Sequence, residues 1–178
     1  MMSLSVKIAA PATLSAVPLV YGLRSAKELA AEVVLLPHNE IAIALREGSV
    51  DVALLPSDAV CSMVGVKIVT DFCVAPAAKG GSLSLADEWG VNPEAPVYGL
   101  LVAREGTDLE VLDNIERALT LGVERIYESL LSQAECPRIE DYEYLTTTVD
   151  YLFDAKKHTA LEAFWKKLKK AASHANPG

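Results

Sequence analysis

Three short apolar segments, each ending at a proline, constrain the fold of this chain most strongly. They are VKIAA before Pro11, AEVVLLP up to Pro37 and VDVALLP up to Pro56. Continuous apolar runs of this length, bounded by a residue that breaks regular structure, indicate strands buried on both faces. Two more strands are expected at residues 66–75 (VKIVTDFCVA) and 96–103.

Stretches with helical periodicity alternate with these strands. Alternating strands and helices with short connections predict a three-layer α/β/α fold with a mostly parallel sheet and helices on both faces. After about residue 105 the pattern becomes predominantly helical, so a helical C-terminal part is expected. The expected helices are one starting at Ser15, one within residues 38–49 that follows a loop at His38, with Asn39 as its N-cap and Gly48 at its end, and then residues 57–64, 109–130, 138–153 and 155–173.

Two serines follow strands at the edge of the sheet where ligands bind in such folds. Ser15 comes after the first strand and Ser57 after the third. A hydroxyl and the free N–H groups at a helix N-terminus together form an anion site, and Thr13 lies in the first of these turns. The alternative is that each serine only caps its helix. We expect Asp51 and Asp71 to have structural roles and not to act as a catalytic acid or base.

Composition excludes several classes of function. The net charge is -8 and the pI about 4.9, which argues against nucleic acid as a partner. Cys61, Cys73 and Cys136 have no metal-ligand spacing, so free thiols in a reducing compartment are expected. The first apolar stretch is interrupted by Pro11 and by polar residues, unlike an export signal, and no segment has the length of a membrane span. A cytoplasmic protein is therefore expected, with no membrane partner.

No motif for a metal, nucleotide or hydrolase site occurs in the sequence, whereas several segments together resemble a known enzyme family. ATLSAVPL (12–19) is similar to the family pattern Ser-Tyr-Leu-Asn-(Ala/Thr)-x-Pro-Leu, and GSVDVALLPS (48–57) to its second motif. LADEW (85–89) with APVYGLLVAR, and YLTTTVDYLFDAKKHTALEAFWKKL (144–168), are similar to its later segments. In this order and spacing, the segments resemble the chorismate dehydratase family of the futalosine route to menaquinone.

The resemblance implies a type II periplasmic-binding-protein-like fold and a lyase that converts chorismate to 3-enolpyruvylbenzoate without a metal or organic cofactor. It implies that Thr13, Ser15 and Ser57 bind the substrate carboxylates, and that Ser15 occupies the catalytic position, where the family has asparagine. Family members also insert a second domain where this chain has only residues 76–83. The chain is therefore interpreted as a single domain, residues 1–178, with 76–83 as a short linker.

Three functions remain open at this point. The first is chorismate dehydration, with an activity that the missing domain and the serine at position 15 are expected to reduce. The second is a non-catalytic or engineered single-domain fragment that binds small carboxylates. The third is a self-associating interaction domain, for which a homodimer would cover apolar surface exposed at the edge of the fourth strand. Trp89 and Trp165 are expected to have structural roles.

Overall fold

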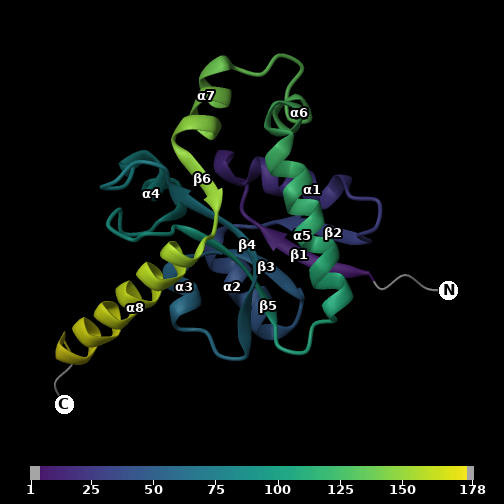
Figure 1. The fold of residues 1–178 in the computed structure, drawn as a ribbon. Helices are drawn as coiled ribbons and strands as arrows, with labels where there is room; N and C mark the ends of the chain where they lie inside the picture. Colours follow the sequence, from purple (N-terminus) through teal and green to yellow (C-terminus); the bar gives the residue numbers. More distant parts are fainter. Residues whose placement is uncertain (1–4, 176–178) are drawn as a thin grey trace.

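The computed structural model describes residues 5–175, with side chains described up to residue 172. A six-stranded sheet of order β2-β1-β3-β5-β4-β6 forms the centre of the molecule (Figure 1). Three of its strands coincide with the segments that end at prolines, which confirms that interpretation of the sequence. The strands are β1 (Val6–Ala10), β2 (Ala31–Leu35), β3 (Val52–Pro56), β4 (Val66–Pro76), β5 (Gly99–Arg104) and β6 (Val149–Leu152).

The α/β fold class is confirmed, but the sheet is mixed and not mostly parallel. β1 pairs in parallel with β2 and β3, whereas β5 is antiparallel to both β3 and β4, and β4 is antiparallel to β6. The reason lies between β4 and β5. The chain there forms only the seven-residue helix α4 (Leu83–Trp89), about 10 Å long, and stays at the edge where β4 ends. β5 therefore starts at that edge and must run back.

Helices cover both faces of the sheet and create two apolar cores. Neighbouring residues of one strand point to opposite faces, so Ile8 belongs to one core and Ala9 to the other, as do Leu54 and Leu55. The first core packs against α1 (Val17–Ser25), α4 and α5 (Leu109–Glu124). The second packs against α2 (His38–Glu47), α3 (Ser57–Cys61) and the start of α8 (Ala155–Ala175). These are the expected three layers.

Several local predictions were wrong. Residues 149–152 were expected in a helix, but α7 (Ile139–Thr147) ends at Thr147 and the chain continues as β6 beside β4. The single helix expected at 109–130 is divided at Arg125 into α5 and α6 (Ile126–Leu131). β4 is not the edge of the sheet, because β6 pairs with its second half. The helix α4 was not expected at all.

Ser15 does not cap a helix, contrary to the expectation from the sequence. It lies within a short 3₁₀ helix, η1 (Leu14–Ala16), and α1 begins two residues later at Val17. The hydroxyl of Ser15 turns instead toward the interior, where its fractional exposure is 0%. This orientation decides what the residue can do at the site.

Candidate functional site

Ser15 is the centre of a buried polar cluster at the carboxyl end of β1. Its backbone N–H and its hydroxyl both donate to Oε1 of Glu88, at 2.7 and 2.6 Å. The indole N–H of Trp89 donates to Ser15 Oγ at 2.8 Å, and the phenol of Tyr151 donates to the Ser15 carbonyl at 2.7 Å. Every polar group of Ser15 therefore has a partner within the protein.

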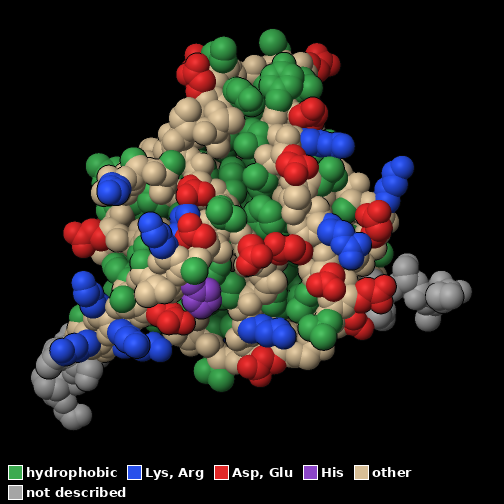
Figure 2. Space-filling model, in the orientation of Figure 1, with side chains coloured by type: hydrophobic (Ala, Val, Ile, Leu, Met, Phe, Trp, Pro, Cys, Tyr) green, Lys and Arg blue, Asp and Glu red, His purple; other side chains and the backbone are tan. Residues whose placement is uncertain are grey.

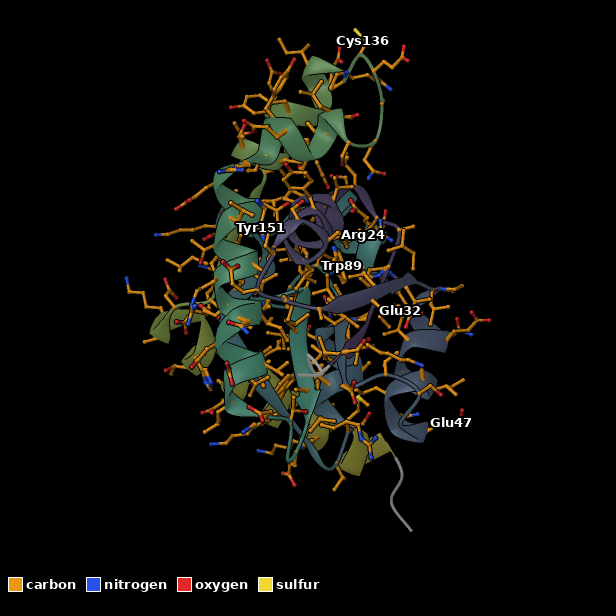
Figure 3. All side chains as sticks on the ribbon, turned by 90° about the vertical axis from the view of Figure 1, so that its right-hand side faces the viewer. Arg24, Glu32, Glu47, Trp89, Cys136 and Tyr151 are labelled. Atoms are coloured by element: carbon orange, nitrogen blue, oxygen red, sulfur yellow. The ribbon has the colours of Figure 1, made fainter. Side chains whose placement is uncertain are left out.

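The two tyrosines of the cluster connect it to α7 and β6. Tyr144 donates to Oε2 of Glu88 at 3.3 Å, and burial raises the pKa of both the Tyr144 and Tyr151 phenols above the ordinary value of 10.0. Both phenols consequently stay protonated and act as donors at neutral pH. Figure 3 shows Trp89 and Tyr151 in the body of the molecule, whereas Cys136 lies at its tip, between α6 and α7.

Ser57 is buried as well, and its hydroxyl faces a protein acceptor. It begins α3 but does not cap it; the hydroxyl donates to the carbonyl of Val97 at 2.6 Å, and the backbone N–H donates to the carbonyl of Tyr98 at 2.9 Å. With 2% of its surface exposed, Ser57 joins α3 to the start of β5. A ligand role for Ser57 stays a prediction.

Thr13 and His38 differ from the serines because each has a buried polar atom without a partner. Thr13 Oγ1 and His38 Nδ1 are screened from solvent and make no hydrogen bond in the described part of the chain. The other ring nitrogen of His38, Nε2, lies 3.1 Å from the Glu88 carbonyl, and the ring packs against that of Trp89 with the ring centroids 5.4 Å apart and the planes tilted by 36°. Because a carbonyl only accepts, we assign the proton to Nε2, which leaves Nδ1 as an acceptor.

Both of these residues line one hollow of about 340 Å³ at the carboxyl ends of β1 and β2. The ten-residue helix α2 begins at this hollow, and the N–H groups of His38 and Asn39 precede its first intrahelical hydrogen bonds. The rest of the lining is apolar. The lining residues are Pro11, Ala12, Thr13, Leu35, Leu36, Pro37 and His38.

A smaller hollow of about 60 Å³ adjoins the first and shares Pro11, Ala12, Thr13 and Leu35 with it. Arg24, at the end of α1, contributes a cation here, and its guanidinium also donates to the Val33 carbonyl at 3.3 Å. Thr13 lines both hollows; the N-terminus of α2 lies at the first and the guanidinium of Arg24 at the second. We call the two hollows together the Thr13 cleft. Such donors are suited to an anion.

Solved structures are similar to this chain in fold. Protein AF1704 from Archaeoglobus fulgidus matches with a TM-score of 0.66 and 12% identity, over 96% of this chain and 97% of that one. The Candida albicans CA3427 gene product matches with a TM-score of 0.61 and 12% identity, over 90% of each chain, and is described as having the generic periplasmic binding protein structural fold. The chain has a periplasmic-binding-protein-like fold.

This fold confirms the structural part of the expectation from sequence. No protein-family model matches the sequence, and no curated protein matches it at a significant level. Within residues 5–175, no group of three or more histidines, cysteines or carboxylates is placed to hold a metal ion. None of the helices described is both long enough and apolar enough to cross a membrane.

The sequence indicated Thr13 correctly as a residue of the first turn, but it gave little sign of the others. Glu88 was noticed only as part of LADEW, Trp89 also as a structural residue, and Tyr144 and Tyr151 only within the segment 144–168. His38 was placed in a loop before a helix, and the structure puts it at the first position of α2. The usable signal was position: His38 follows a strand and Pro37, as Ser57 follows a strand and Pro56.

Replacing Ser15 by alanine should destabilise the protein. The change removes the hydroxyl that donates to Glu88 and accepts from Trp89, so it leaves a partly buried carboxylate oxygen and a buried indole N–H with one partner fewer. We expect the free energy of unfolding to fall by about 2–3 kcal/mol in urea denaturation. Ser62→Ala, at an exposed serine, should change it by less than about 0.5 kcal/mol. An equal, small effect of both substitutions would contradict the described role of Ser15.

Proposed function

We propose that this chain binds a small carboxylate in the Thr13 cleft and does not convert it. The observation that carries the proposal is that two residues lining one hollow beside the N-terminus of α2 each have a buried, unpartnered polar atom, Thr13 Oγ1 and His38 Nδ1. An unmet buried polar group costs about 1–3 kcal/mol. A ligand that provides both missing partners recovers this free energy on binding.

The two atoms require different groups from the ligand. Thr13 can donate its hydroxyl proton to a carboxylate oxygen, which the first N–H groups of α2 also favour. Nδ1 of a neutral His38 ring accepts, so it fits a hydroxyl or another donor on the same ligand. Leu35, Leu36 and Pro37 provide apolar contact for the carbon skeleton. The ligand class is therefore a small hydroxycarboxylate, and chorismate has both groups.

Chorismate dehydration is the second candidate, supported by the similarity of motifs and by the fold. The elimination needs a donor free to orient the substrate, and in this chain all polar groups of Ser15 are bonded to Glu88, Trp89 and Tyr151. A site without a covering domain also leaves the substrate open to water, which weakens orientation and electrostatic stabilisation. We propose that the single-domain chain retains binding and has lost turnover.

Calorimetric titration with chorismate and 4-hydroxybenzoate tests the binding. We expect saturable binding of both, and weaker binding of benzoate, which lacks the hydroxyl. Thr13→Val keeps the shape of the side chain and removes its hydroxyl, so it should weaken binding about tenfold. His38→Phe keeps a ring against Trp89 and should have an effect of similar size. Chromatography of the chorismate samples should show no 3-enolpyruvylbenzoate above the rate without protein.

Ser57→Ala is the matched control, because the Ser57 hydroxyl is bonded to Val97 and lies outside the Thr13 cleft. Its affinity for chorismate should equal that of the unchanged protein once folding is confirmed by circular dichroism. If Ser57→Ala weakens chorismate binding and Thr13→Val leaves it unchanged, the binding site lies at α3 and not in the Thr13 cleft. Turnover within tenfold of a full-length family member would overturn the proposed loss of activity, and no binding at millimolar ligand would overturn the proposal itself.

A further inference from the structure

Helix α8 (Ala155–Ala175) projects from the body of the molecule (Figure 1). Four lysines, Lys166, Lys167, Lys169 and Lys170, give it a cluster of positive charge. Among its residues 155–172, only Leu161 is buried. Phe164, Trp165 and Leu168 continue the same apolar stripe but are only partly covered, and the indole N–H of Trp165 has no acceptor in the described part of the chain. The end of this helix therefore has an apolar face that its own chain covers incompletely.

The opposite charge lies nearby, in a groove between α5 and the start of α8. Figure 2 shows acidic side chains gathered on this face of the molecule. The groove has a volume of about 700 Å³, room for several side chains. It is lined by Ile68, Val69, Thr70, Asp71, Leu112, Asp113, Glu116, Phe153, Asp154, Ala155, His158 and Thr159. We call it the acidic groove.

The base of the acidic groove is the part of β4 that β6 does not cover. β6 pairs with β4 from Phe72 onward, so residues 68–71 face the groove without a neighbouring strand on that side. The backbone N–H of Asp71 instead donates to the carboxylate of Glu116, at 3.2 and 3.4 Å to its two oxygens. Asp154 is paired with Lys157, but no described cation pairs with Asp71, Asp113 or Glu116.

The complementary lysines belong to the same chain but cannot reach this groove in the same molecule. Lys166, Lys167, Lys169 and Lys170 are exposed near the end of α8. They lie 8–12 residues beyond His158, which lines the groove, and that separation corresponds to roughly 12–18 Å along the helix axis. A second copy can bring them there.

We propose that two copies of the chain form a symmetric dimer in which α8 of each lies in the acidic groove of the other. The two helices run antiparallel about a two-fold axis near Glu162 and Ala163, so that residues 166–170 of one copy face residues 155–159 of its partner. A two-fold interface of this kind uses the same surface on both copies. The apolar stripe then packs in the middle, with lysine–carboxylate contacts on both sides.

Sedimentation velocity and light scattering test the dimer directly. We expect a mass of twice 19.1 kDa at high concentration, reversible on dilution and weakened by salt, because the contacts are between exposed charges. The double substitution Lys166→Glu with Lys169→Glu should raise the dimer dissociation constant at least tenfold. Asp71→Lys with Asp113→Lys, both at exposed positions, should do the same.

A mixture of the two double variants gives the decisive result, because one now offers an acidic helix and the other a basic groove. We expect the mixture to form heterodimers that neither variant forms alone. Lys27→Glu with Lys79→Glu is the control, with the same change in net charge at exposed lysines elsewhere, and should dimerise as the unchanged protein does. A monomer at all concentrations would overturn the proposal. A dimer that tolerates both double variants would equally overturn it, by showing that association uses another surface.

Discussion

Gly122→Val should strongly destabilise the protein. α1 and α5 cross so closely that Gly122 lies against the backbone of Pro18, and a Cβ at position 122 would clash with the Pro18 carbonyl and come within 3.1 Å of the Cα of Gly22. Backbone atoms of two packed helices cannot move aside as a flexible side chain can. We expect the free energy of unfolding to fall by about 3 kcal/mol or more.

Urea denaturation followed by circular dichroism measures this change. Thr120→Val is the matched control, since it places the same side chain on the exposed side of α5, two residues away. It should change the free energy of unfolding by less than about 0.5 kcal/mol. Similar stability of the two variants would mean that α1 and α5 are farther apart than described.

Trp89→Ala should have the largest effect of any side-chain truncation. The ring is fully buried and lies where a Cβ on Gly99 would come within 2.8 Å of it, it packs against the ring of His38, and its N–H donates to Ser15. The substitution removes a large packed side chain and the donor to Ser15 together. We expect a loss of about 4 kcal/mol in the free energy of unfolding.

Trp165→Ala provides the comparison, because Trp165 is only partly covered. The sequence predicted a structural role for Trp165, and truncation of a well-buried tryptophan costs about 3 kcal/mol. Its observed exposure lowers the expectation to about 1 kcal/mol, measured at a concentration where the protein is monomeric. A loss at Trp165 that equals the loss at Trp89 would show that the Trp165 ring is more deeply buried against the second core than its exposure indicates.

The sequence by itself determined the strands β1, β2 and β3 and the three-layer fold class. Their apolar runs are continuous and end at Pro11, Pro37 and Pro56, so the signal is local and does not depend on distant contacts. The same logic placed Thr13 in the turn after β1, where the structure has it lining a hollow; its role in binding stays a prediction. A local pattern can determine which residues form a strand and where the strand stops.

Only the tertiary structure decided the direction of β5, the existence of β6 and the roles of the site residues. Residues 149–152 form a strand because they pair with β4, some 75 residues earlier in the chain. The local sequence of these four residues does not reveal that pairing. Ser15 likewise faces inward because Glu88, 73 residues away, accepts from its backbone N–H and its hydroxyl, whereas Thr13 Oγ1 and His38 Nδ1 have no partner among the described residues. Which polar groups remain free to bind a ligand depends on contacts between distant segments, and these exist only in the folded chain.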